Sequence, residues 1–238
     1  MELLVVSDSH YLNRAESVIK YPERQGLQGL DLLRGVWERE SARGRPDVLI
    51  LLGDLVENGF VAGADQDLQD VSGWVRGLGV PCLAVCGNHD GPAASFERLF
   101  NEAGFYEVGG YGFMVFNDDV AKGDYTTRRA GDLVRLAQVA AERPDLPLVA
   151  LQHNPVYPRV SHPTYPYMLT NEQEVIDAYL TSKVILSLSG HYHAGQSACR
   201  LGGLTVCTVP ALCEAPFRYA RVKLNGRVVS VTDCNMGQ

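Results

Sequence analysis

The sequence lacks any run of about 18 apolar residues, the length that a membrane-spanning helix requires. Its 238 residues carry 21 Lys and Arg against 28 Asp and Glu, which gives a net charge of −7 and no general basic surface for nucleic acid phosphates. We therefore expect neither a membrane nor a nucleic acid as partner. An apolar stretch begins at Leu3 with no charged leader or cleavage site before it, which predicts a cytoplasmic protein.

The six cysteines do not show the CxxC spacing of zinc sites. Cys82 and Cys86 would share one face of a strand, and core packing is favoured over a soft-metal or redox pair. A glycine-rich phosphate loop of the P-loop type is missing too, and no serine or cysteine in the polar motifs has the setting of an activated nucleophile. These absences argue against a P-loop enzyme and against a covalent intermediate.

The composition is that of a folded chain, with 46% hydrophobic and 21% charged residues. A chain of this length and composition can bury a substantial core. Linkers, internal repeats and low-complexity segments are not evident. We expect one domain over residues 1–238.

Five short apolar runs are each followed directly by polar residues. The runs cover residues 3–6, 48–52, 82–86, 148–151 and 184–188, and they lead respectively into Asp8 and His10, Asp54, Asn88 and His89, His153, and His191 and His193. Five of the six histidines lie in these motifs. Open α/β sheets place their sites at the carboxyl ends of strands, so the pattern predicts one shared site.

Helix-like patterns separate these runs. They cover residues 27–37, 68–78 and 92–104, and Thr170 with Gln173 matches the capping box of a fourth helix. From about residue 196, the turn signals Gly202-Gly203 and Asn225-Gly226 predict antiparallel hairpins. The expected fold is α/β, with mixed sheets and helices outside them. The stretches Glu57–Asp67 and Asn154–Tyr167 are expected to be loops that form walls of the site.

The polar motifs supply seven candidate metal ligands: Asp8, His10, Asp54, Asn88, His153, His191 and His193. If Asp54 bridges two ions, each ion receives four protein ligands and keeps open positions for water and substrate. Two ions about 3.5–4 Å apart can hold a bridging hydroxide that attacks a phosphoester. His89 is then the candidate general acid beside the leaving oxygen, and Asn88 and His89 are the candidate substrate-binding residues. Asp90 either orients His89 or caps the helix after Pro92.

These motifs, in this order from Asp8 to His193, resemble the calcineurin-like metallophosphoesterases. The resemblance implies a four-layer αββα sandwich of two mixed sheets. It also implies one metal held by Asp8, His10, Asp54 and His193, and a second held by Asp54, Asn88, His153 and His191. The implied cofactors are two divalent ions, Mn²⁺, Fe²⁺/Fe³⁺ or Zn²⁺, and the mixed donor set does not choose among them.

The length of the chain and the run from Gly53 to Gly59 are similar to those of the small bacterial class III phosphodiesterases. Gln152 stands where many relatives have a second histidine, and Ser9-His10-Tyr11 replaces a glycine-containing run. Neither departure removes a ligand.

We therefore expect hydrolysis of small phosphoesters, with 3′,5′-cyclic nucleotides as the leading class. The alternatives are a phosphomonoesterase or nucleotide pyrophosphatase with the same dimetal site, and, ranked lower, a non-catalytic metal-stabilised binding scaffold. Tyr157, Tyr165 and Tyr167 are candidates for stacking on a base, although loop packing is the favoured interpretation. Arg159 either contacts a phosphate or is simply solvated.

Overall fold

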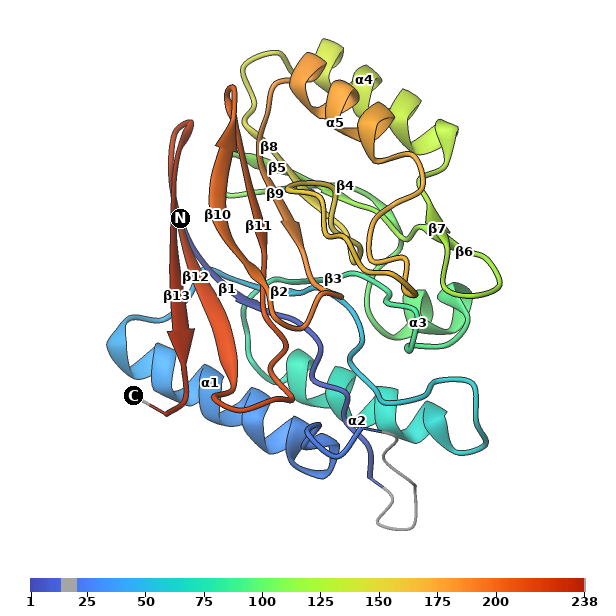
Figure 1. Ribbon diagram of the computed structural model, residues 1–238. Helices are drawn as coiled ribbons and strands as arrows, with labels where there is room; N and C mark the ends of the chain where they lie inside the picture. Colours follow the sequence, from blue (N-terminus) through green and yellow to red (C-terminus); the bar gives the residue numbers. More distant parts are fainter. Residues whose placement is uncertain (14–20, 238) are drawn as a thin grey trace.

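The computed structural model describes residues 1–13 and 21–237, and it shows two β-sheets packed face to face with helices on both outer sides (Figure 1). The first sheet has the strand order β13-β12-β1-β2-β3. The three strands β1, β2 and β3 run parallel, and β12 and β13 extend the sheet antiparallel. Their bounds are β1 (Glu2–Val6), β2 (Val48–Leu51), β3 (Cys82–Ala84), β12 (Arg218–Asn225) and β13 (Val228–Asn235).

The second sheet has the strand order β10-β11-β9-β8-β5-β4, with four parallel strands between two antiparallel edges. A separate two-stranded ribbon pairs β6 with β7. The bounds are β4 (Gly104–Val108), β5 (Tyr111–Val115), β6 (Asp119–Val120), β7 (Thr126–Thr127), β8 (Leu148–Leu151), β9 (Val184–Ser189), β10 (Gln196–Leu201) and β11 (Leu204–Thr208).

The helices form the outer layers. Figure 1 shows α1 and α2 along the first sheet and α4 and α5 along the second. None of the helices in the described ranges is long and apolar enough to cross a membrane. The bounds are α1 (Gly29–Arg43), α2 (Ala64–Arg76), α3 (Ala93–Leu99), α4 (Ala130–Glu142) and α5 (Glu172–Thr181), and the 3₁₀-helix η1 (Gly26–Gln28) precedes α1.

The layers follow from strands that are apolar on both faces. In β1, Leu3 and Val5 belong to the core between the two sheets, whereas Leu4 and Val6 belong to the core under α1 and α2. A third core lies between the second sheet and its helices. Successive side chains of a strand point to opposite faces, so a continuous apolar run fills two cores at once. The predicted four-layer αββα fold is confirmed.

The predicted hairpins are also confirmed, because β10–β11 and β12–β13 turn at Gly202 and Gly226, both with positive φ. The predicted capping box is wrong. Asn171 is the residue before α5 and makes no capping bond, while the Thr170 hydroxyl pairs with Thr127 and the Gln173 amide with Asp177. The Thr170 hydroxyl is engaged by a residue outside the helix, and the Gln173 amide is engaged by Asp177, one turn further along α5.

The bounds of two predicted segments also shift. The third helix-like pattern shortens to α3, and β4 begins at Gly104. The expected loop from Glu57 ends where α2 begins at Ala64. The sequence analysis did not identify β4, β5 or α4.

Candidate metal centre

The five polar motifs meet at one edge of the two sheets, beyond the carboxyl ends of β1, β2, β3, β8 and β9. Backbone hydrogen bonds align the first two loops: the Asp8 amide donates to the Gly53 carbonyl at 3.0 Å, and the His10 amide to the Asp54 carbonyl at 2.9 Å. A third bond, from the Gly190 amide to the His153 carbonyl at 2.9 Å, aligns the loops of the second sheet. Parallel strands therefore deliver all the motifs to one place, as predicted.

The loops leave little room for side chains other than those present. A Cβ atom at Gly87 would overlap the Asp54 carboxylate, and one at Gly190 would overlap the Ser7 hydroxyl.

Four of the candidate ligands have left-handed backbones: Asp8, His10, Asp54 and His191 have φ values between 44° and 65°. Such conformations are uncommon for residues with a Cβ and gather at functional sites.

The first group of donor atoms comprises Asp8 Oδ1, His10 Nε2, Asp54 Oδ2 and His193 Nε2. His10 Nε2 lies 3.3 Å from His193 Nε2, 3.7 Å from Asp54 Oδ2 and 3.9 Å from Asp8 Oδ1. Asp8 Oδ1 lies 3.4 Å from His193 Nε2. Neighbouring ligands of one ion at bond lengths near 2.1 Å are separated by roughly 3–3.5 Å. The spacing suits a single ion after small adjustments.

The second group comprises Asp54 Oδ2, Asn88 Oδ1, His153 Nε2 and His191 Nδ1. His153 Nε2 lies 3.3 Å from Asp54 Oδ2, 3.2 Å from Asn88 Oδ1 and 3.1 Å from His191 Nδ1. The same oxygen of Asp54 thus faces a histidine of each group. This is the geometry expected of a bridging carboxylate.

Both carboxylates have one oxygen held by the protein and one directed at the donor groups. Asp8 Oδ2 accepts hydrogen bonds from the Ser7 hydroxyl and from the His191 amide at 3.0 Å. Asp54 Oδ1 accepts from the His89 amide at 2.8 Å. Each hydrogen bond fixes the orientation of its carboxylate. The other oxygens, Asp8 Oδ1 and Asp54 Oδ2, therefore already face the place where a cation would bind.

Three candidate ligand histidines have the other ring nitrogen bound to an oxygen. Nδ1 of His10 lies 3.1 Å from the Glu57 carboxylate, Nδ1 of His193 lies 2.5 Å from the Glu214 carboxylate, and Nδ1 of His153 donates to the Leu52 carbonyl at 2.7 Å. Metal-bound histidines commonly donate their second ring nitrogen in this way. The contacts orient each ring with Nε2 toward the donor groups.

Electrostatics links the imidazoles to the buried carboxylates. Burial alone would lower the pKa of His153, but the charges of Asp54 and Asp8 outweigh it and raise the pKa to about 10. Burial likewise lowers the pKa of His193, but the facing carboxylates of Asp8 and Glu214 outweigh it and raise that pKa to about 9. Burial and the nearby His153 lower the pKa of His191 to about 3. The carboxyls of Asp8 and Asp54 have pKa values below their usual range, because the facing histidines outweigh burial. They are therefore ionised at neutral pH.

The donor groups fit a pair of divalent ions. Among the described residues, the buried atoms Asp8 Oδ1 and His191 Nε2 have no hydrogen-bond partner. Buried polar atoms are normally bonded, so the unpartnered Asp8 Oδ1, which faces the first donor group, points to a cation there. His191 Nε2 is the ring nitrogen that does not face the second donor group, and it does not bear on the cation. A set of carboxylate, amide and imidazole donors suits Mn²⁺, iron or Zn²⁺ alike.

His89 lies beside the first group, with its ring edge-on to His10 at a centroid distance of 4.7 Å. Its Nδ1 donates to the Glu57 carbonyl at 2.6 Å, which leaves Nε2 to exchange a proton with a bound molecule.

Asp90 plays neither of the two roles considered for it. Its carboxylate accepts from the amides of Leu55, Val56 and Gly87 and joins the loops after β2 and β3, while Pro92 precedes α3. Burial and the charge of Asp54 raise its pKa to about 7.

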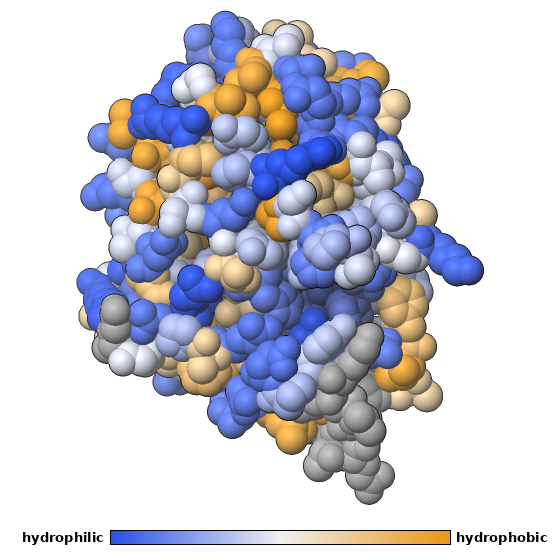
Figure 2. Space-filling view, viewed as in Figure 1, coloured by the Kyte–Doolittle hydropathy of each residue, from blue (hydrophilic) through white to orange (hydrophobic). Residues whose placement is uncertain are grey.

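A cavity of about 720 Å³ opens over the donor groups. Figure 2 shows both hydrophilic and hydrophobic residues on the face that it views, with hydrophilic residues across its middle. Tyr165 and Tyr167 line the cavity and contact the His191 ring, with centroids 5.5 and 5.6 Å away. Tyr157 packs instead into the core under α4 and α5, and Arg159 pairs with Glu172 on the surface. Two of the three candidate tyrosines are therefore placed to contact a ligand.

The sequence analysis missed four residues around the centre. Glu57 and Glu214 orient His10 and His193, and Arg24 lies 3.3 Å from the Glu57 carboxylate and 4.5 Å from the centre of the Tyr21 ring. The sequence offers one weak indication of Glu57, which is that it follows the candidate ligand Asp54 by only three residues. Arg24, Tyr21 and Glu214 come from segments without a motif.

Comparisons with known proteins agree with this geometry. A model of the calcineurin-like phosphoesterase family matches residues 1–195. The chain is 30% identical over 165 residues to a probable cyclic nucleotide phosphodiesterase of Synechococcus, covering 62% of this chain and 58% of that protein, less than two thirds of its length. It is 27% identical over 223 residues to a cAMP/cGMP dual specificity phosphodiesterase of Mycobacterium tuberculosis, covering 89% and 67% of the two chains.

The fold is also found in a solved structure, that of a dimetal phosphatase from Danio rerio. The TM-score is 0.73 at 16% identity, and the match covers 98% of each chain. This likeness shows the four-layer architecture. The family model covers most of the sequence and every candidate ligand. The chain therefore belongs to the calcineurin-like phosphoesterase family.

Proposed function

We propose that this chain is a metal-dependent phosphodiesterase that hydrolyses small phosphodiesters, with 3′,5′-cyclic nucleotides as the leading class. The observation that carries the proposal is the pair of donor groups sharing Asp54 Oδ2 beneath an open cavity lined by His89. When bound, two divalent ions would polarise phosphoryl oxygens and lower the pKa of water. The two relatives named as cyclic nucleotide phosphodiesterases support the substrate class.

The protein residues supply the remaining chemistry. His89 Nε2 faces the substrate side and delivers a proton to the leaving oxygen, while the Glu57 carbonyl keeps Nδ1 protonated. Asn88 presents its amide beside the same position and can orient a phosphoryl oxygen. Tyr165 and Tyr167 form an aromatic wall on which a base can stack.

The charges around the cavity favour a diester over a monoester. Among the described residues that line it, Arg24 is the single permanent cation, and its guanidinium is held by Glu57. Glu23, Asp124 and Glu214 add negative charge to the wall. A monoester or a pyrophosphate carries more negative charge than a diester, so these wall carboxylates repel it more strongly and work against its attraction to the bound ions. The same argument disfavours a long polyanion such as nucleic acid.

The test compares bis-p-nitrophenyl phosphate with p-nitrophenyl phosphate, using protein stripped of metal and reloaded with Mn²⁺. Asp54→Ala should abolish diester hydrolysis, because both donor groups lose their shared oxygen. Asp145→Ala, at an exposed carboxylate before β8, is the matched control and should leave the rate unchanged. Hydrolysis of the diester would then justify assays with cyclic AMP and cyclic GMP.

Two outcomes would contradict the proposal. A preference for the monoester would favour the phosphomonoesterase alternative. Metal-loaded protein that hydrolyses neither compound, nor cyclic nucleotides, would favour the binding scaffold. The presence of all seven donors and His89 in one cluster argues for catalysis, since a scaffold has no use for a proton donor at this position.

A further inference from the structure

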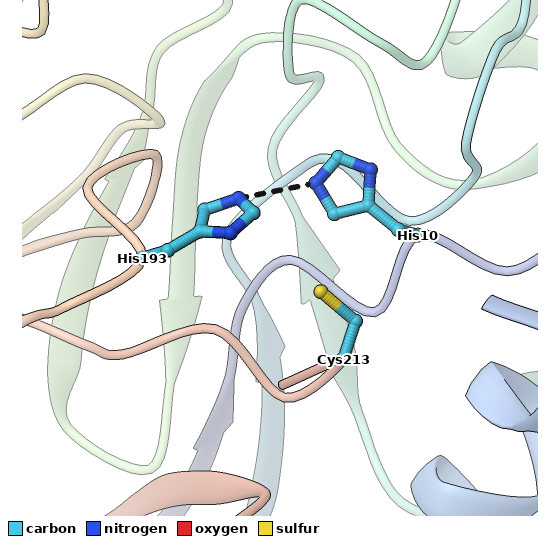
Figure 3. Close-up of side chains that lie close together, drawn as sticks. All are labelled: His10, His193 and Cys213. Atoms are coloured by element: carbon cyan, nitrogen blue, oxygen red, sulfur yellow. Dashed lines mark hydrogen bonds between the residues drawn. The ribbon is translucent and has the colours of Figure 1, made fainter. Parts of the chain in front are cut away.

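The Cys213 thiol lies against the first donor group. Cys213 follows β11 on the way to β12, and its side chain points toward the rings of His10 and His193 (Figure 3). Its Sγ and one ring nitrogen of each histidine all lie within 4.8 Å of one another. The side chain is completely buried.

The backbone fixes this position. The Cys213 amide donates to the Asp8 carbonyl at 3.1 Å, and the Cys213 carbonyl accepts from the Gln25 amide at 2.8 Å. The next residue, Glu214, holds His193. The segment that carries the thiol is therefore tied to two of the candidate ligands, Asp8 and His193.

The distances are compatible with one ion in contact with all three side chains. A Zn–S bond is about 2.3 Å and a Zn–N bond about 2.1 Å, so a sulfur and a nitrogen on opposite sides of one ion are at most about 4.4 Å apart. The sulfur can lie opposite only one of the two nitrogens, and a neighbouring sulfur and nitrogen on one ion are about 3.1–3.6 Å apart. Atoms within 4.8 Å of one another therefore need shifts of up to about 1.5 Å to share an ion.

A second observation points to a cation at the same position. Asp8 Oδ1 is buried, has no hydrogen-bond partner among the described residues, and lies 3.4 Å from His193 Nε2. Oδ1 and the thiol thus both lie near the His193 ring. A buried carboxylate oxygen without a hydrogen bond is costly in free energy, and a bound cation at this position would remove that cost.

Simple packing explains the other buried cysteine but not this one. Cys207 belongs to the apolar core between the two sheets. Cys213 belongs to none of the three apolar cores formed by the described residues. Its sulfur lies near one ring nitrogen each of His10 and His193.

We propose that Cys213 supplies a thiolate ligand to the ion held by Asp8, His10, Asp54 and His193, an inference that rests on the proposed metal centre. On binding, a sulfur–metal bond forms, the thiol proton passes to solvent, and no atom is oxidised or reduced. A thiolate makes this position softer than its partner position. It therefore favours Zn²⁺, Fe²⁺ or Co²⁺ over Mn²⁺, whereas the second position keeps oxygen and nitrogen donors alone.

The test loads the metal-stripped protein with Co²⁺ and records its absorption spectrum. A sulfur-to-cobalt charge-transfer band in the near ultraviolet should be present in the wild type and absent in Cys213→Ser. Cys86→Ser is the matched control, because Cys86 is a half-buried thiol close to Gly87 and should leave the band intact. Far-ultraviolet circular dichroism shows whether each variant is folded.

A wild type without the band, or a band that survives in Cys213→Ser, would overturn the inference. If the serine variant does not fold, X-ray absorption of the wild-type protein loaded with Zn²⁺ decides the matter, through the presence or absence of sulfur at about 2.3 Å. Neither spectrum depends on turnover. Inactive protein that shows the sulfur ligand would contradict the proposed function and leave this inference standing.

Discussion

Arg128 offers a sharp test of how the protein supports its site. It is 1% exposed, its guanidinium pairs with Asp118 through two nitrogens, and it lies 3.7 Å from the centre of the Phe116 ring. It also donates to the Tyr179 hydroxyl at 2.9 Å, and that hydroxyl donates to Gln152, the residue before His153. A buried cation with this many partners couples the ribbon β6–β7, helix α5 and the loop of a candidate ligand.

Arg128→Met should lower the free energy of unfolding by about 3–5 kcal/mol, the usual cost of removing one partner of a buried ion pair. The reason is that Asp118, with a side chain only 4% exposed, is left without its cation. The neighbouring Arg129→Met is the control. Arg129 is 45% exposed and pairs with Asp132 at 3.0 Å, so its loss should cost about 1 kcal/mol or less.

Urea unfolding of the metal-free proteins, followed by circular dichroism, measures both values. The double variant Arg128→Met/Asp118→Leu should recover much of the loss, because an apolar pair leaves no unpaired charge. A loss below about 1 kcal/mol for Arg128→Met, or no recovery in the double variant, would refute the argument that an unpaired charge is the cause.

Three further predictions concern the site itself. His89→Ala should reduce kcat for diester hydrolysis by about 100- to 10,000-fold with little change in bound metal, measured by steady-state kinetics and elemental analysis. Glu214→Gln should weaken metal binding by about 10- to 100-fold in a chelator competition, because His193 loses the carboxylate that orients it. The raised pKa values of His153 and His193 contribute stability to the metal-free protein below about pH 6.5, and this is lost as pH rises through about 9 and 10. Thermal unfolding with chelator should therefore show a falling midpoint over that range, and a constant midpoint would contradict the assignment.

The architecture and most of the donor set could be predicted because both depend on local patterns. A strand buried on both faces, such as Val48–Leu51, is a continuous apolar run, and the polar residues that follow it lie at the sheet edge. The structure brings all seven predicted ligands together. Their role as ligands stays a prediction.

The supporting residues could not be predicted because they reach the centre through tertiary packing. Glu214 follows His193 by 21 residues and meets it only after β10 and β11 have folded back. Asp90 bonds to three amides of two loops, and no pattern in the sequence distinguishes this from a helix cap. Thr170 matched a capping motif, but its hydroxyl meets Thr127 from a distant segment.

The left-handed backbone conformations of Asp8, His10, Asp54 and His191 lower the stability of the folded protein at residues that the candidate site needs. Each such conformation costs of order 1–3 kcal/mol for a residue with a Cβ, and the cost is borne by the packed cores on either side. Glycine at these positions would relieve the strain and remove a ligand at the same time. Selection for stability alone would therefore erode this site, and its persistence requires selection for what the four side chains do.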